Sequence, residues 1–339
     1  MQARNLVAMV AVGVVLGMTG SAQQAIPRTP DGRPDLQGIW DYATITPLER
    51  PASVTDLAMS EAAARALEKA AADRVERGAR PSDPNRGAPP VGGLVSARTG
   101  ETGVGGYNNI YIDSGDLVAR IDGVYRTSLI VDPPDGRVPA LTPEARQRSM
   151  ARAAARKGRE FDHPEFRPVG ERCIVSFGST SPLLPNYFYN NHVQIVQTPD
   201  HVLILTEMVH DARIVRLNAE HLPPHVRPWL GDSVGRWEGD TLVVDTTNFP
   251  PQHLFRGQSA ERLHVIERFR RVDAHTIVLR FTIDDPTTYT RPWTGEVPLR
   301  ASTEAIYEYA CHEGNYALDN ILRGERSRDR AREAAKKPQ

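Results

Sequence analysis

The feature that most constrains the fold is a series of short apolar strands separated by tight turns, which begins near His192. Residues 193–197 turn into 202–207, and residues 264–271 turn into 276–283. Further strands are expected at 212–217, 235–237, 241–245 and 305–311. Strands of this length joined by short turns are typical of an antiparallel meander. Because about eight such strands can close into a barrel that leaves no free edge, we predict a mainly β protein built on an antiparallel barrel.

Two helices are predicted before this series. Residues 55–78 are rich in Ala, Leu, Glu, Lys and Arg, and either Thr55-Asp56 or Ser60 can cap them. A second, basic helix is expected from Thr142 to about Lys157, because Thr142 suits the N-cap and a proline follows at the first helical position. These helices are expected to lie at the periphery of the barrel.

The other segments define the domain organisation. Residues 33–42 are expected to form a turn and then a first strand, short strands are expected at 109–113 and 127–132, and residues 79–106 are a Pro/Gly-rich linker. The charged tail is expected to be either a solvated helix, which would be the third, or disordered. We therefore divide the chain into a signal peptide at 1–22, an N-terminal strand, helix and linker at 23–106, a barrel domain with one inserted helix at 107–320 and a charged tail at 321–339.

The first residues are typical of a secretory signal. Arg4 precedes a short apolar stretch from Leu6 to Met18, and small residues follow it. The stretch is short for a membrane span, so cleavage after Ala22 is the first expectation and cleavage after Ala25 the second; an uncleaved anchor is the alternative. The mature chain is therefore expected in the periplasm or outside the cell, with no stable membrane insertion.

The chain contains two cysteines, Cys173 and Cys311. In an exported protein the two can form one disulfide, and the alternative is a pair of buried thiols. Sequence spacing alone does not choose between them.

The charge balance bears on the kind of partner. The 41 Lys and Arg residues nearly match the 42 Asp and Glu residues, which gives a formal net charge of −1. Nucleic-acid binding depends on clustered cations, so no nucleic-acid partner is expected. We expect a small organic ligand, no cofactor and no protein-bound metal, and the sequence does not predict an oligomeric state.

Two sets of residues carry a family resemblance. Gly38-Ile39-Trp40 at the first strand, followed by the meander, resembles the lipocalin-like (calycin) barrels, in which such a tryptophan plugs the closed end. The segments GDSVGRWEGDTLVVDT (231–246) and YEYACHEGN (307–315) resemble those of secreted bacterial proteins that mostly have no assigned function. The first resemblance implies a lipocalin-like barrel, and the second implies a shared fold without a reaction.

Two short motifs have a functional and a structural interpretation. Residues 231–235 match Gly-x-Ser-x-Gly, the nucleophile elbow of α/β-hydrolases, but a hairpin follows where the elbow needs a helix, which favours a simple turn. His221 and His225 have the spacing of a helical zinc pair, but two prolines between them prevent that helix.

Ionisable and aromatic residues within the expected strands are the better candidates for a site. One face of residues 264–269 carries Val265, Glu267 and Phe269. A barrel points one strand face at its lumen, where polar groups mixed with aromatic rings can line a ligand site. The residues proposed for catalysis are His264, Glu267 and Asp285, and those proposed for substrate binding are Arg268, Tyr289, Trp293, Trp237 and Tyr307. The alternative is that these residues form solvent-facing ion pairs on the barrel exterior.

These residues suggest a function hypothesis. A histidine beside a carboxylate can move protons near neutral pH, and an arginine can stabilise developing negative charge. The leading hypothesis is a cofactor-free acid–base enzyme, a lyase, isomerase or hydrolase, that acts on a small organic molecule inside the barrel. The alternatives are a periplasmic carrier or envelope-associated binding protein without chemistry, and a metal-dependent hydrolase.

Overall fold

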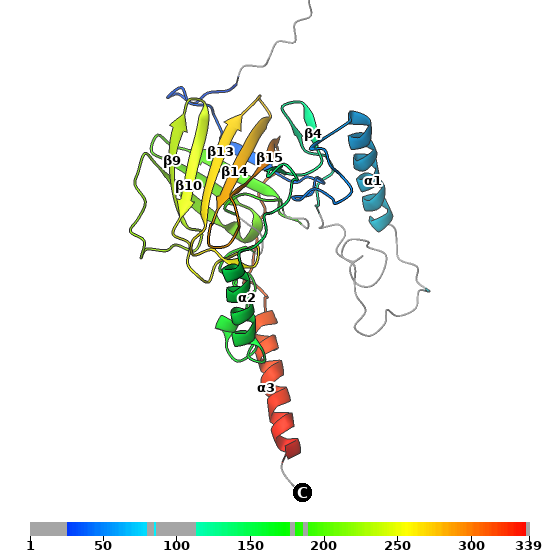
Figure 1. Cartoon of the computed structure of the whole chain (residues 1–339), viewed down its shortest axis with the longest axis vertical. Helices are drawn as coiled ribbons and strands as arrows, with labels where there is room; N and C mark the ends of the chain where they lie inside the picture. Colours follow the sequence, from blue (N-terminus) through cyan, green and yellow to red (C-terminus); the bar gives the residue numbers. More distant parts are fainter. Residues whose placement is uncertain (1–25, 80–84, 86–112, 177–179, 186–188, 337–339) are drawn as a thin grey trace, which may run out of the picture.

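The computed structural model describes residues 26–79, 85, 113–176, 180–185 and 189–336. Within them, nine strands form a closed barrel (Figure 1). The barrel is closed because the strand formed by Gly38–Asp41 pairs with the strand His192–Gln197 on one side and with the strand Trp293–Ser302 on the other. In spatial order they are β1 (Gly38–Asp41), β6 (His192–Gln197), β7 (His201–Thr206), β8 (Ala212–Leu217), β9 (Asp232–Glu238), β10 (Thr241–Thr247), β13 (His264–Arg271), β14 (Thr276–Asp284) and β15 (Trp293–Ser302). The predicted mainly β barrel is confirmed.

The strand order is mixed rather than a pure meander. β8 and β9 run parallel, with Arg216 opposite Val234 and Leu217 opposite Gly235. A parallel pair requires the chain to return along the barrel before it starts the next strand, and the connection 218–231 provides that length. β1 comes from the N-terminal segment and lies between β6 and β15, so the barrel uses residues from both sides of the 79–106 linker.

The last barrel strand is not the expected one. Residues 305–311 form no strand, and β15 closes the barrel in their place. Its sequence is interrupted by Gly295 and Pro298, which obscure the alternation expected of a strand. Gly295 lies against the ring of Phe281, where no larger residue fits. Pro298 falls between the stretch of β15 that pairs with β5 (Ile130–Asp132) and the stretch that pairs with β1, so its missing N–H removes no hydrogen bond on that side.

Three α-helices lie outside the barrel in the described part of the chain: α1 (Glu61–Ala79), α2 (Pro143–Arg156) and α3 (Ala317–Lys336). Ser60 caps α1 and Thr142 caps α2, since each hydroxyl accepts a hydrogen bond from the backbone three residues on. Figure 1 shows α1 beside a small sheet, α2 at one end of the barrel, and α3 extending away from it. The small sheet contains β2 (Ala58–Met59), β3 (Arg120–Ile121) and β4 (Val124–Arg126).

The interior of the barrel is filled mainly by apolar side chains. Residues 265, 267 and 269 of β13 face inward together, as the alternation predicts, and Phe269, Phe281 and Leu279 are fully buried there. Trp40 is 1% exposed, donates its indole N–H to the Leu36 carbonyl at 2.9 Å, and lies beneath the guanidinium of Arg271. Arg271 is the last residue of β13, and Trp40 lies beside it. Trp40 therefore fills the end of the barrel at which β13 ends.

The two cysteines form a disulfide. The Cα atoms of Cys173 and Cys311 are 5.8 Å apart, and the bond joins positions separated by 138 residues. It connects the loop after α2 to the segment before α3.

No helix in the described ranges has both the length and the apolar content required to cross a membrane. The expected signal peptide, almost all of the linker after Ala79 and most of the strand expected at 109–113 lie outside the described residues.

Candidate functional site

Glu267, proposed as catalytic, lies on the inner face of β13 and is fully buried. Its carboxylate pairs with Arg213 of β8 across the interior, with Nη1–Oε2 at 2.7 Å. The backbone N–H of Leu183 donates to the same carboxylate at 3.3 Å, and Arg213 also contacts the Ser181 hydroxyl. Glu267 therefore anchors the segment 180–185 inside the barrel.

His264, the proposed catalytic histidine, lies on the outer face and does not meet Glu267. Its Nε2 is 2.9 Å from Asp245 of β10, and the same carboxylate contacts His221 at 3.1 Å. The hydrogen bond that His264 donates to the Asp245 carboxylate raises the pKa of His264 against the opposing effect of burial. His221 also contacts Asp232, so the outer face carries a chain of alternating imidazoles and carboxylates.

Three other proposed residues lie in or beside the core. Trp293 is fully buried and stacks on Phe255, with ring centroids 6.2 Å apart. Tyr289 meets Trp293 edge-on, and burial raises its pKa to about 12. Asp285 is buried too, but its carboxylate accepts hydrogen bonds from the backbone and hydroxyl of Thr287 and so stabilises a turn.

The last three proposed residues are separated from one another. Arg268 lies on the outer face of β13, and Trp237 packs against the core beneath Arg33. Tyr307 is 71% exposed, and its backbone N–H donates to Glu207. The structure therefore does not bring the eight proposed residues into one site.

The two short motifs have structural roles. Ser233 of the Gly-x-Ser-x-Gly match lies within β9, and its hydroxyl is 2.8 Å from that of Thr246, so no strand-to-helix elbow forms. His221 and His225 lie in a turn region, and His225 is exposed. No group of three or more potential metal ligands occurs in the described part of the chain.

A cavity of about 640 Å³ lies at the end of the barrel where β10 ends and β13 begins. Its walls come from α2, the loop 165–172, the segment 184–185 and the residues around the hairpin of β11 (Leu254–Phe255) and β12 (Gln258–Ser259). This volume is within the usual range for small-molecule sites. None of the eight proposed residues lines it, although Tyr289 and Trp293 pack behind its wall residue Phe255.

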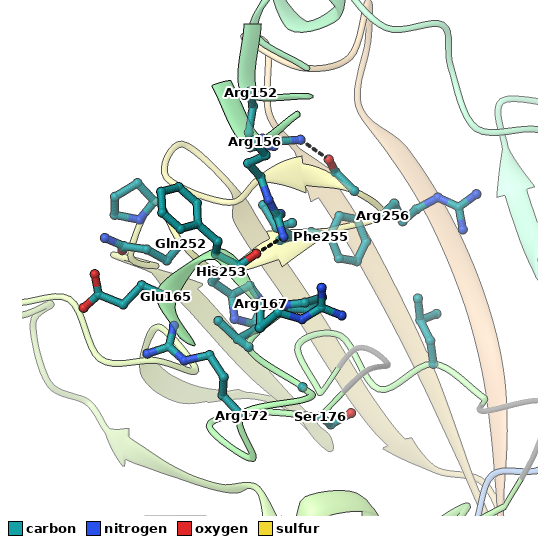
Figure 2. Close-up of a pocket in the computed structure, with 18 of the residues that line it drawn as sticks. Arg152, Arg156, Glu165, Arg167, Arg172, Ser176, Gln252, His253, Phe255 and Arg256 are labelled. Carbon is teal, nitrogen blue, oxygen red and sulfur yellow. Dashed lines mark hydrogen bonds between the residues drawn. The ribbon is translucent and has the colours of Figure 1, made fainter. Parts of the chain in front are cut away.

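Arginine is the main charged residue of the cavity wall. Figure 2 shows Arg152 and Arg156 descending from α2. Each donates a hydrogen bond to a backbone carbonyl, Arg152 to Gly257 and Arg156 to Phe166. Burial, together with the neighbouring cations Arg156 and Arg148, lowers the pKa of Arg152. The wall therefore holds positive charges close enough to repel one another.

Two other wall arginines are neutralised locally. Arg167 forms a bidentate pair with Glu171, with distances of 2.8 and 3.0 Å, and Arg256 pairs with Glu49 at 2.9 Å. By contrast, Arg152, Arg156 and Arg172 have no ion pair with any carboxylate of the described residues. The carboxylate in the wall, Glu165, has a side chain that is 75% exposed and lies 3.8 Å from His163. The cavity therefore has an excess of positive charge.

His253 is one of the two buried polar residues among the described residues of the wall, and Ser176 is the other. His253 is 8% exposed, its ring packs on Phe249, and it makes a hydrogen bond with the backbone of Trp229. Its Nδ1 is buried without a hydrogen-bond partner. Burial lowers the pKa of His253 to about 4, so the imidazole is neutral at pH 7.

Sequence reasoning missed this cavity, although α2 carries a signal for it. Arg148, Arg152 and Arg156 recur every four residues, which places them on one face of a helix. The sequence gives no comparable sign for His253, because its burial comes from Phe249 and Trp229 and from the closure of the barrel end.

No family model matches this chain, and comparisons with curated proteins and with solved structures find no match.

Proposed function

We propose that this protein binds a small organic anion, a carboxylate or a phosphate, in the cavity at the end of the barrel. The observation that supports it most is the pair Arg152 and Arg156, whose guanidinium groups line the cavity without an ion-pair partner among the described carboxylates. Partly buried cations gain strong, charge-assisted hydrogen bonds from an anionic ligand. The aromatic and aliphatic wall, including Phe166, Phe255 and Leu184, suits an apolar body attached to that anionic group.

The experiment that tests this proposal is calorimetric titration with phenylacetate and with phenyl phosphate, which share an aromatic body and differ in the anion. At least one probe should bind, and replacement of both Arg152 and Arg156 by methionine should weaken it at least about tenfold. Arg146→Met is the matched control, because Arg146 is on the same helix, also donates to a backbone carbonyl and does not line the cavity. Equal affinities for the double variant and the wild type contradict the proposal.

Acid–base catalysis on the bound anion is the second candidate function. The observation that favours it is that the cavity wall contains His253, because histidine is the side chain that most often transfers protons in enzymes. Native mass spectrometry of freshly purified protein would identify a bound molecule. Incubation of that molecule with the protein in deuterated water then separates the two functions, since a carrier returns it unchanged and a proton-transfer enzyme exchanges or converts it.

We also propose that the chain is exported and related to lipocalin-like barrels and to secreted bacterial proteins with similar segments. The N-terminal segment with its short apolar stretch and the disulfide Cys173–Cys311 support export. Trp40 supports the barrel relationship, because it lies at the end of the barrel away from the cavity. N-terminal sequencing of the mature chain tests export; a chain that keeps Met1 contradicts cleavage at residue 22.

A further inference from the structure

A serine, a histidine and a glutamate meet at the outer surface of the barrel: Ser302, His192 and Glu207. Ser302 lies opposite Ile39 of β1, and His192 lies opposite Asp41. Because positions 39 and 41 point to the same side of the strand, Ser302 and His192 share that side and reach each other across β1. The Ser302 hydroxyl oxygen is 3.2 Å from Nε2 of His192.

Glu207 lies beside the other ring nitrogen of His192. Its Oε2 is 3.6 Å from Nδ1, and its backbone N–H donates to the His192 carbonyl at 3.0 Å. The side chain of Glu207 is buried, and the Tyr307 N–H donates to its Oε1 at 2.9 Å. Although burial raises the pKa of Glu207, the hydrogen bonds to its carboxylate outweigh this effect and lower the pKa below its usual value. Glu207 is therefore an anion at neutral pH.

The anionic Glu207 fixes the tautomer of the imidazole. A neutral imidazole carries one N–H, and the adjacent carboxylate stabilises this proton on Nδ1. Nε2 then has a lone pair that faces the Ser302 hydroxyl. The Glu304 N–H donates to Oγ of Ser302 at 3.1 Å, so the oxygen already accepts one hydrogen bond and its own proton can donate to Nε2.

We propose that these three residues form a catalytic triad that hydrolyses a carboxylic ester, with Ser302 as the nucleophile and His192 as the general base. Glu207 is the positioning residue, because it acts on the ester only through His192. A hydroxyl within hydrogen-bond reach of a base, which a third group orients, is the arrangement that activates serine in hydrolases of unrelated folds.

The surroundings of the serine indicate the class of ester. Ser302 is partly exposed and its neighbours Ala301 and Thr303 are exposed, so a substrate can approach from solvent. Two further carboxylates, Asp41 and Glu304, add negative charge at the imidazole. Because they would repel an anionic substrate, the site favours an uncharged ester.

The reaction balances in two steps. Oγ of Ser302 forms a bond with the carbonyl carbon of the ester as its proton passes to Nε2 of His192, and the alkoxy group leaves with that proton as an alcohol. A water molecule then attacks the acyl carbon and gives a proton to Nε2. The bond between Oγ and this carbon breaks, the carboxylic acid is released, and Oγ takes the proton back.

This group of residues is separate from the anion-binding cavity. Ser302 is the last residue of β15, whereas the first residue, Trp293, packs behind the cavity wall residue Phe255. The inference therefore goes beyond the proposed function and does not depend on it.

Covalent labelling with a fluorophosphonate, followed by mass spectrometry of the digested protein, tests the proposal. An activated serine displaces the fluoride and keeps the phosphonyl group. In the wild type the label should map to Ser302, and His192→Gln should slow this labelling at least about a hundredfold, because it removes the base. Hydrolysis of 4-nitrophenyl acetate should slow in parallel in His192→Gln and in Ser302→Ala.

His201→Gln is the matched control. His201 is a partly exposed histidine of the barrel that lies 3.0 Å from a carboxylate, that of Asp200, and its loss should leave the labelling rate of Ser302 unchanged. Absence of the label from Ser302 in the wild type overturns the proposal. Labelling of Ser302 at the wild-type rate in His192→Gln overturns it as well.

The pH dependence of labelling tests the role of Glu207. The titratable groups that act on the His192 imidazole are four carboxylates, of which the first is paired with Arg300: Asp41, Asp113, Glu207 and Glu304. The contact with Glu207 raises the pKa of His192 above 6.5 against the effect of burial, so labelling of the wild type should rise with pH through this raised pKa and then level off.

In Glu207→Gln the rise should move to lower pH, and the plateau rate should fall at least about tenfold, because the imidazole loses the carboxylate that orients it. A merely structural role of Glu207 would not move the midpoint. A wild-type rate that climbs in proportion to hydroxide without a plateau overturns the proposal, and this measurement needs no variant.

Discussion

Arg213 and Glu267 are joined by two parallel hydrogen bonds, of 2.7 and 3.0 Å, across the interior of the barrel. Both side chains are almost completely buried, with 2% and 0% of their surfaces exposed. Charges so fully removed from water are tolerated because each compensates the other and because Ser181 and Leu183 add further hydrogen bonds. The pair thereby holds the segment 180–185. The last two residues of this segment, Leu184 and Pro185, form part of the cavity wall.

Removal of one partner of this pair should destabilise the protein strongly. Arg213→Met leaves the Glu267 carboxylate buried without its cation and should lower the free energy of unfolding by about 3–5 kcal/mol. The double variant Arg213→Met with Glu267→Met should lose much less, since no uncompensated charge remains. Urea denaturation of four proteins, wild type, Arg213→Met, Glu267→Met and the double variant, measures this, and losses that simply add in the double variant would show that the pair is not coupled.

His264 should contribute stability at acid pH. Its folded-state pKa is raised above 6.5 by Asp245, so the contribution is fully present below pH 6.5 and is lost as pH rises through the raised pKa. Because the imidazole is one-third exposed, the contribution should be no more than about 1 kcal/mol. The free energy of unfolding of His264→Asn relative to wild type, measured from pH 5 to pH 9, tests the sign. The exposed His225 gives the control variant His225→Asn, which should show no such trend.

In contrast to His264, the buried His253 should destabilise the folded protein at acid pH. Its folded-state pKa is about 4, so the unfolded chain binds a proton between pH 6.5 and 4 that the folded protein does not. The resulting loss of stability on acidification should be about 3 kcal/mol at most. His253→Phe should therefore show a shallower decline in the free energy of unfolding over this pH range than wild type. An unchanged slope would mean that His253 titrates normally in the folded protein.

The disulfide should contribute through the loop that it closes. A bond across 138 residues restricts the unfolded chain and should stabilise the fold by about 4–5 kcal/mol. The variant with serine at both Cys173 and Cys311 should unfold at correspondingly lower urea concentration. Wild type in the presence of reductant should match that variant, whereas the variant itself should not respond to reductant.

The cap of α2 should affect both stability and the cavity. The Thr142 hydroxyl accepts a hydrogen bond from the Ala145 N–H at 3.1 Å. Thr142→Ala should cost about 1 kcal/mol, and Thr142→Ser, which keeps the hydroxyl, should cost little. Loss of the cap should fray the start of α2, whereas Arg152 and Arg156 lie in its last turns. The effect on anion binding should therefore be small. Urea denaturation and titration of phenylacetate measure the two effects separately.

Much of the barrel was predictable because strand patterns are local. Alternating apolar residues and short turns at 193–206 and 264–283 correspond to β6, β7, β13 and β14. The closing strand β15 was missed because Gly295 and Pro298 interrupt its alternating pattern. Gly295 is required by the ring of Phe281 that lies against it, and Pro298 is tolerated because it lies between the part of β15 that pairs with β5 and the part that pairs with β1. Phe281, β5 and β1 are not adjacent to β15 in the sequence, so no local pattern predicts these contacts.

The amino-acid sequence by itself determined the barrel class, the Thr142 cap of the second helix and the shared strand face of Val265, Glu267 and Phe269, because each depends on residues a few positions apart. Only the tertiary structure decided that Glu267 meets Arg213, that His264 meets Asp245 on the outside, and that Arg152, Arg156 and His253 share one cavity. The physical reason is that burial and charge pairing depend on which segments come together in space, and α2 meets the β11–β12 hairpin through residues 105 to 109 positions apart in the sequence.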